Sequence, residues 1–256
     1  MGKRGLIISD INTGKEVKDL VDAYLIPLKD FSINYPSVFS LEDIIEIKKT
    51  NKEVYIFINK NIHEKEITKL KEILLEIEKI KINGIIFYDI ALVELKKELN
   101  LKTELIWNQE HLANSYGTVN YWYDKGVKSS YLSSELTKRE IEEIRENTKA
   151  KLFVNVFGYI PMFTSRRHLV DNYQNTFSIK EKGNKIYKEG KTYNIFDTKH
   201  GTTVYSNYIL NIKENINADY LIYNSNLIPN IKDILKDNNM KEENGFLYQE
   251  TIYKVK

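Results

Sequence analysis

The chain contains no cysteine among its 256 residues. This absence excludes disulfide bonds, a thiol nucleophile and an iron–sulfur cluster ligated by cysteines of this chain. No apolar run reaches the length of a membrane-spanning helix, and the first ten residues lack the continuous apolar segment of a signal peptide. We therefore expect a cytoplasmic protein with no membrane segment.

Neither sign of charge is in excess. The 38 basic residues nearly balance the 36 acidic residues, which gives a formal net charge of +2. The net charge therefore does not support RNA as a partner, and such a partner would need a local basic patch. The hydrophobic content of 42% over 256 residues is enough for one sizeable core, so we expect residues 1–256 to form a single domain.

Several signatures of familiar chemistry are missing. The sequence has no phosphate loop, no dinucleotide fingerprint after a strand and no Gly-x-Ser-x-Gly elbow. Its four histidines show no zinc-site spacing. The sequence therefore disfavours nucleotide and serine-hydrolase chemistry, and it predicts no metal and no cofactor.

Short apolar runs alternate with charged segments whose apolar residues recur at helical spacing. This pattern is typical of repeated βα units. Strands are expected over residues 5–9, 23–28, 53–59, 84–89, 104–108, 128–133, 151–157 and 220–224. Eight such units predict an α/β fold of the (β/α)8 TIM-barrel type.

Helices are expected between these strands. Their ranges are residues 41–49, 64–81, 92–99, 118–125, 138–147, 208–216 and 231–237, with Ser40 and Thr137 as N-caps. The first crossover, residues 13–21, is short and weakly patterned, so a distorted barrel remains open. Alternating residues and glycine turns over 177–205 predict a small β-hairpin insertion after the seventh strand.

In a parallel barrel, ligand sites lie at the carboxyl ends of the strands. Glu135 at such an end is a candidate general base, although it can equally cap the following helix. Asp89 is either a second carboxylate or a turn residue. Gln109 either orients a substrate amide or satisfies loop backbone groups. Asn224 ends the eighth strand and is a further candidate for substrate binding.

Two adjacent arginines follow the seventh strand. Arg166 and Arg167 would form a fork for a carboxylate or phosphate, or else remain solvated or pair with nearby acids. His168 next to them is a candidate acid, base or metal ligand, although a lone histidine is a weak signal. In a water-activating hydrolase, Glu135 or His168 would be the base and Arg167 would hold an oxyanion or a substrate carboxylate.

The order of residues 155–173 resembles the signature of the collagenase-like peptidases of family U32. Six positions agree, namely Gly158, Ser165, Arg167, Leu169, Asn172 and Tyr173. Pro161 and His168 stand where that signature has its two cysteines. The segment 108–115 is also similar to a segment of the family, as is the Asp-x-x-x-Gly-Thr order of residues 197–202.

This resemblance implies a related barrel and a peptidase-family protein that acts on a peptide or small molecule. It leaves one alternative open. Some branches of the family resemble parts of hydroxylation systems for RNA bases or quinone precursors, which use cysteine-bound iron–sulfur clusters and sometimes paired subunits. Because this chain has no cysteine, it would then be a non-catalytic or accessory subunit that works with a longer, cysteine-containing paralogue.

Overall fold

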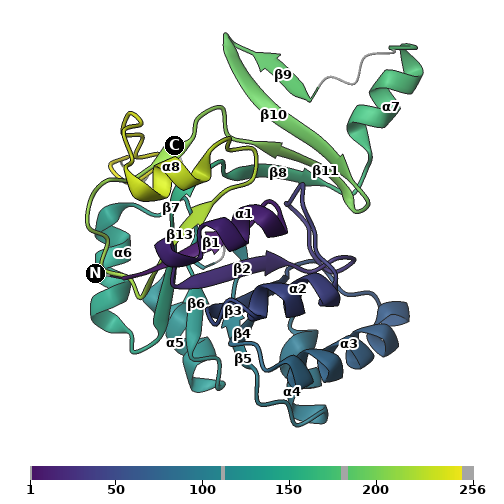
Figure 1. Cartoon of the computed structure of the whole chain (residues 1–256), viewed down its shortest axis with the longest axis vertical. Coiled ribbons are helices and arrows are strands. Elements are labelled where there is room, and N and C mark those ends of the chain that lie inside the picture. Colours follow the sequence, from purple (N-terminus) through teal and green to yellow (C-terminus); the bar gives the residue numbers. More distant parts are fainter. Residues whose placement is uncertain (1, 111–112, 180–183, 250–256) are drawn as a thin grey trace, which may run out of the picture.

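Eight parallel strands close into a barrel in the computed structural model, which describes residues 2–110, 113–179 and 184–249 (Figure 1). The strands are β1 (Lys3–Ile7), β2 (Ala23–Pro27), β3 (Glu53–Ile58), β4 (Gly84–Phe87), β5 (Glu104–Trp107), β6 (Ser129–Tyr131), β7 (Lys151–Gly158) and β13 (Tyr220–Asn224). Each pairs with the next, β7 pairs with β13, and β13 pairs with β1. The TIM-barrel prediction is confirmed, and all eight predicted strands are present.

Aromatic side chains fill the inside of the barrel. The rings of Phe153 and Tyr220 stack with centroids 4.2 Å apart, and Tyr55 meets Phe153 edge-on at 5.3 Å. Tyr131 and Phe57 extend the same buried cluster. The barrel is therefore a packed core rather than a pore, as the fold requires, and a ligand can reach only its ends.

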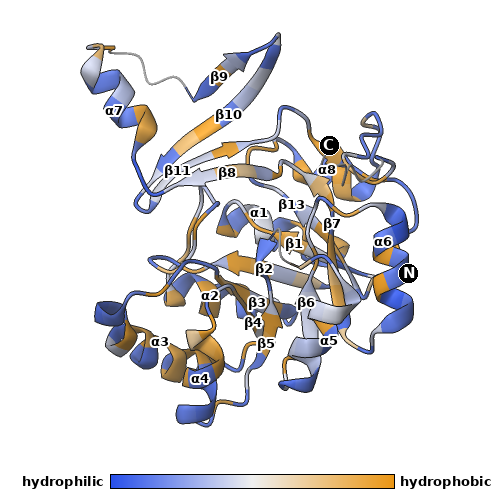
Figure 2. Cartoon of the chain, turned by 180° about the vertical axis from the view of Figure 1, so that it is seen from behind, coloured by the Kyte–Doolittle hydropathy of each residue, from blue (hydrophilic) through white to orange (hydrophobic). Residues whose placement is uncertain are grey.

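Helices surround the barrel. They are α1 (Ile11–Glu16), α2 (Leu41–Lys48), α3 (Ile67–Ile80), α4 (Ala91–Glu98), α5 (Tyr116–Asp124), α6 (Lys138–Asn147) and α8 (Ile231–Lys236), with single 3-10 turns η1 (Lys18–Leu20) and η2 (Glu64–Glu66). Ser40 and Thr137 form capping boxes with Asp43 and Glu140, as predicted. The barrel strands β3 to β5 are mainly hydrophobic in Figure 2, while the helices also carry hydrophilic outer turns.

One predicted helix is wrong. Residues 208–216 form no helix and instead contain β12 (Leu210–Asn211), which pairs antiparallel with the end of β7. The Asn211 side chain is buried and donates hydrogen bonds to the carbonyls of Met240 and Lys241. These distant backbone partners hold the segment in an extended form, although its apolar spacing suits a helix.

A second sheet lies beyond the carboxyl ends of the barrel strands (Figure 1). It contains β8 (Pro161–Ser165), β11 (Gly201–Tyr205), β10 (Lys191–Thr198) and β9 (Lys185–Lys188) in that order, all antiparallel. Helix α7 (Leu169–Thr176) packs against β10 and β11. We call the described residues 161–179 and 184–205 the arm. It includes the segment in which hairpins were expected and extends back to Pro161.

No helix in the described ranges combines the length and apolar character that crossing a bilayer requires.

Candidate functional site

A small cavity of about 70 Å³, lined by both polar and apolar side chains, lies at the carboxyl ends of the barrel strands. Asparagines from four separate parts of the barrel line it: Asn59 after β3, Asn108 after β5, Asn155 within β7 and Asn224 at the end of β13. Glu135, in the loop after β6, lines the same cavity. Parallel strands bring these positions together although they are far apart in the sequence.

Hydrogen bonds hold the cavity wall in place. The Tyr131 hydroxyl donates to Asn155 Oδ1 at 2.5 Å, and Asn155 Nδ2 donates to Ser134 Oγ at 2.8 Å. Burial raises the pKa of Tyr131 above its ordinary value, so the phenol keeps its proton at neutral pH. The orientation of the Asn155 amide is thereby fixed, because its oxygen must accept and its nitrogen must donate.

Asn34, from the loop between β2 and α2, joins the cavity to the arm. Its side chain donates to Glu110 Oε1 at 2.5 Å and accepts from Thr164 Oγ1 of β8 at 2.5 Å. Its backbone carbonyl accepts from the Tyr205 hydroxyl of β11 at 2.6 Å. The residue is buried and has a φ of 69°. Asparagine tolerates this left-handed conformation better than most residues.

Three predicted binding residues make contacts that also satisfy loop backbone groups. Asp89 accepts from the Ile62 N–H at 2.8 Å and from the Ala91 N–H at 3.0 Å. Gln109 Nε2 donates to a backbone carbonyl at 3.1 Å. Asn224 lines the cavity while its Oδ1 accepts from a loop N–H two residues on. Each side chain therefore shapes the loops at this face, whatever else it does.

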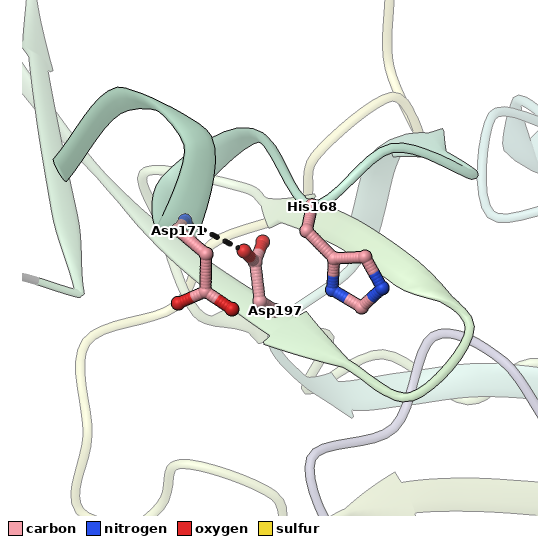
Figure 3. A group of neighbouring side chains, drawn as sticks. All are labelled: His168, Asp171 and Asp197. Carbon is pink, nitrogen blue, oxygen red and sulfur yellow. Dashed lines mark hydrogen bonds between the residues drawn. The ribbon is translucent and has the colours of Figure 1, made fainter. Parts of the chain in front are cut away.

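The two predicted catalytic residues lie on different elements. Glu135 is exposed at the cavity, and its N–H donates to Ser133 Oγ at 3.2 Å. His168 belongs to the arm, directly before α7, and is also exposed. Its neighbours there are Asp171 and Asp197 rather than the cavity wall (Figure 3). The structure therefore gives Glu135 and His168 separate surroundings.

His168, Asp171 and Asp197 form a small cluster on the arm (Figure 3). One potential ligand atom from each lies within 4.8 Å of the others. Asp197, however, also accepts from the Asp171 N–H at 2.9 Å and from the hydroxyl of Thr202. Its negative charge sits at the amino end of α7, where it stabilises the helix. Helix capping therefore explains the position of Asp197.

The second predicted pair, Arg166 and Arg167, follows β8. Arg166 is exposed and lines a groove outside the cavity. Arg167 is also exposed, and its backbone carbonyl accepts from Thr202 Oγ1 at 2.7 Å. Within the described part of the chain, the structure records no ion pair for either guanidinium.

We call this hollow, of about 640 Å³, the basic groove. Barrel loops form one side and the arm forms the other. Its cationic and imidazole side chains are Lys60, His63, Lys65, Arg166, Lys199 and His200. Two acidic side chains, Glu66 and Glu110, also line it, and Glu66 pairs with Lys60 at 2.5 Å. Lys199 pairs at 2.7 Å with Asp30, which lies outside the lining. The lining thus holds four lysine and arginine residues against two acids, and two of the four, Lys60 and Lys199, are in ion pairs.

Apolar side chains lie among these charges. Phe163 is 54% exposed and Met162 is 39% exposed, and both line the basic groove together with Tyr88. Burial lowers the pKa of the His200 imidazole, and the nearby Lys60 and Lys199 lower it further. That ring is therefore neutral at pH 7. Glu110 and Pro161 line both the basic groove and the cavity, so the two hollows adjoin.

A third hollow, of about 460 Å³, lies at the opposite end of the barrel. Lys3 and Glu53 pair across it at 2.5 Å, and Lys151 and Glu104 pair at 3.6 Å. Residues at the amino ends of barrel strands usually serve stability, whereas sites lie at the carboxyl ends. The cavity and the basic groove are therefore the candidate functional site.

Two glycines, Gly158 in the signature segment 155–173 and Gly201 in the segment 197–202, stand where the backbone excludes a side chain. Gly158 has a φ of 115°, and a Cβ there would lie 2.5 Å from the Asn224 carbonyl oxygen. Gly201 has a φ of 122°, and a Cβ there would lie 1.9 Å from the Ser165 carbonyl oxygen. Both positions require glycine because the backbone conformation is left-handed and the approach is close.

The proline at the first cysteine position lies in β8 and lines both hollows. Its side chain has no donor atom for a metal. Because the chain has no cysteine at all, its side chains do not provide the ligands of a cysteine-bound iron–sulfur cluster.

Sequence reasoning missed Asn34, Lys199 and His200. The last two lie in the tight turn between β10 and β11, which brings them to the basic groove. The Lys199-His-Gly201 order is a turn signal, but only the folded arm shows which hollow this turn faces.

Comparison with known proteins identifies the family. The Peptidase family U32 profile matches residues 14–240, so the chain belongs to this family. A relative named tRNA hydroxylation protein P2, from Bacillus subtilis, is 28% identical over 224 residues, which cover 80% of this chain and 72% of that protein. A protein named Uncharacterized protease MJ0090, from Methanocaldococcus jannaschii, is 33% identical over 127 residues, which cover 48% of this chain and 30% of that protein.

A solved structure supports the fold. The U32 peptidase Mk0906 superposes with a TM-score of 0.59 at 14% identity, covering 88% of this chain and 92% of that one. At 14% identity, this similarity shows only that the two proteins share the barrel fold.

Proposed function

We propose that this protein is an RNA-binding component of a tRNA hydroxylation system. The observation that carries the proposal is the basic groove, which combines cationic side chains with the exposed ring of Phe163 and adjoins the cavity. Phosphates bind lysine and arginine, and unstacked bases stack on aromatic rings. The similarity to a tRNA hydroxylation protein over most of both chains supports the same reading.

The local distribution of charge supports RNA binding better than the net charge does. The formal net charge of only +2 hides a local excess of cations in the basic groove. Lys65 and Arg166 are exposed there, and the described residues include no ion-pair partner for either. Both charges are therefore available to phosphates without first breaking an internal pair.

The cavity offers a place to read a base. Its asparagine side chains carry both donors and acceptors, which match the polar edge of a nucleobase. Its volume is only about 70 Å³. Entry of a base would therefore require the loops that carry Asn34 and Glu110 to separate.

Binding of labelled tRNA at several salt concentrations tests the proposal. Each phosphate contact contributes a slope of about one to the dependence of log affinity on log salt. We expect Lys65→Ala and Arg166→Ala each to reduce the slope by about one. Phe163→Ala should weaken binding by about 1–3 kcal/mol and leave the slope unchanged, because stacking releases no counterions.

Two exposed basic residues of α6 and its following turn serve as matched controls. Arg139 and Lys149 lie outside the set of residues that line the basic groove. Arg139→Ala and Lys149→Ala should leave both the affinity and the slope close to those of the wild type. Equal losses in the groove variants and these controls would reduce the binding to non-specific attraction and overturn the proposal.

Peptide hydrolysis is the second candidate, with Glu135 as the general base at the cavity. The observation that favours it is the position of Glu135 beside Ser133, Ser134 and Asn155 in the cavity wall. Arg166 in the adjoining basic groove would then hold a substrate carboxylate. Of the other residues predicted from the sequence, Asn224 lines the same cavity, whereas Asp89, Gln109, Arg167 and His168 lie outside its lining.

A peptide library incubated with the purified protein tests this candidate. Hydrolysis that falls at least about a hundredfold in Glu135→Gln, as expected for loss of a general base, would support it. Equal cleavage by the wild type and Glu135→Gln would exclude Glu135 as the base, and His168→Ala would make the corresponding test of the imidazole.

A further inference from the structure

Helix α7 carries an apolar stripe on its outer side. Leu169, Tyr173 and Phe177 follow one another at intervals of four residues and are 36%, 58% and 63% exposed. Gln174, by contrast, is buried. A surface helix normally turns its apolar side inward and its polar side to solvent. Here a polar residue is buried and the apolar stripe is exposed, which is typical of a helix that meets a partner.

The stripe belongs to a wider apolar region of the arm. Of the 15 large apolar side chains that are exposed among the described residues, eight lie between Met162 and Tyr187. Scattered exposed apolar residues need no explanation, but a concentration of them marks an interaction surface.

Strand pairing places one further apolar residue on the same side of the arm. Asp197 contacts the start of α7, so its side chain faces that helix. Tyr193 is four residues earlier in the same strand and faces the same side. Ile186 pairs with Tyr193 in the neighbouring strand and therefore shares this face. It is 38% exposed.

The charge of the arm indicates what would cover the stripe. Its described residues include six lysines and arginines and three acids, a difference of +3. The basic residues are Arg166, Arg167, Lys185, Lys188, Lys191 and Lys199, and the acids are Asp171, Glu189 and Asp197. A second copy of this chain would bring the same positive surface, and like charges across an interface are costly.

The edge of the sheet does not offer a better docking mode. Strand β9 is the outer strand and begins and ends with lysine, at Lys185 and Lys188. Two copies paired antiparallel along this strand would place Lys185 opposite Lys188. Lysines at an edge commonly block such pairing, so docking should use the face of α7 instead.

We propose that the outer face of α7 docks a different protein chain, whose contact surface is apolar at its centre and acidic at its rim. RNA fits the stripe less well. Leu169 is aliphatic, and the rings of Tyr173 and Phe177 pack on each other at 4.8 Å rather than standing free for bases. The inference goes beyond the proposed RNA binding, since the stripe shares no residue with the lining of the basic groove.

Site-specific cross-linking in the native host tests this proposal. The photoreactive residue p-benzoylphenylalanine replaces Tyr173 in one full-length variant and Tyr121 in a control. Tyr121 lies on α5 and is 57% exposed, so it matches Tyr173 in type and exposure. We expect the Tyr173 variant alone to form an adduct with one other protein, at a peptide with apolar residues flanked by Asp or Glu.

Reconstitution with that purified protein completes the test. Calorimetry should show that Tyr173→Ser and Phe177→Ser each weaken binding about tenfold or more, as central aromatic contacts commonly do. Tyr121→Ser should stay within about twofold of the wild type. Both serine variants should keep the wild-type melting temperature, because the replaced rings are mostly exposed.

Each of four results would overturn the proposal. They are an adduct with RNA, an adduct with a second copy of this chain, no adduct at Tyr173, and a reconstituted affinity that the stripe variants do not change. None of these results depends on the salt slope of tRNA binding, so failure of this proposal and failure of the proposed function remain distinct.

Discussion

Replacing Asn34 tests how the arm is joined to the barrel. Its side chain exchanges hydrogen bonds with Glu110, Thr164 and Thr203, at 2.5, 2.5 and 3.3 Å. Asn34→Ala removes all three, at about 1 kcal/mol each. Alanine also costs about 1 kcal/mol more than asparagine at this positive φ. We therefore expect the free energy of unfolding to fall by about 4 kcal/mol.

Urea denaturation followed by circular dichroism measures this loss. For a chain of this size, 4 kcal/mol corresponds to a fall of about 8–16 °C in the melting temperature. Asn100→Ala is the matched control, because Asn100 also has a positive φ but is exposed. It should cost only about 1 kcal/mol.

Asn34→Asp distinguishes the contact with Glu110 from the contacts with Thr164 and Thr203. It keeps the acceptor oxygen but places a second carboxylate beside Glu110, so the pKa of the new carboxyl is expected to rise. A raised pKa means that the loss of stability is present at neutral pH and is relieved as the pH falls through that pKa. Two results would refute the reasoning. One is a free energy of unfolding of Asn34→Ala within 1 kcal/mol of the wild type, and the other is a loss of stability in Asn34→Asp that does not shrink toward pH 5.

Three further predictions concern the same region. Two lysines hold the pKa of Asp30 below its usual range, so Asp30→Asn should lose about 1 kcal/mol in urea denaturation at pH 7. This difference should begin to shrink near pH 4, where the unfolded carboxyl takes up its proton, and should vanish only as the pH falls through the lowered pKa of the folded state. Asp197→Ala should speed hydrogen exchange at the Asp171 amide about thirtyfold, because Asp197 caps α7 there with about 2 kcal/mol of stabilisation. Unchanged exchange would show that Asp197 does not cap the helix. Gly158→Ala should cost at least about 3 kcal/mol in thermal unfolding, since its Cβ would collide with the Asn224 carbonyl; a melting temperature equal to wild type would contradict this.

The barrel could be predicted because its strands are buried on both sides. Such strands appear in the sequence as short continuous apolar runs, and β2 (Ala23–Pro27) is buried at every residue. The prediction of a helix over 208–216 was wrong. The apolar spacing of the segment suits a helix, but the distant partners of Asn211 keep it extended.

The candidate site could be predicted only in part. Strand-end position pointed to Glu135 and Asn224, and both line the same cavity because the fold brings all carboxyl ends to one face. Asn34, Lys199 and His200 depend on how the arm folds back over the barrel loops. Contacts between such distant segments have no local pattern that a single sequence could reveal.

The most direct test of the RNA proposal is nucleoside mass spectrometry of tRNA from the native host. The strain to compare with the wild type carries Lys65→Ala and Arg166→Ala in the chromosomal gene, and a control strain carries Arg139→Ala and Lys149→Ala. We predict that hydroxylated nucleosides fall sharply in the groove variant while the control strain matches the wild type. Wild-type levels of hydroxylated nucleosides in the groove variant, with the variant protein present at normal abundance, would contradict the account.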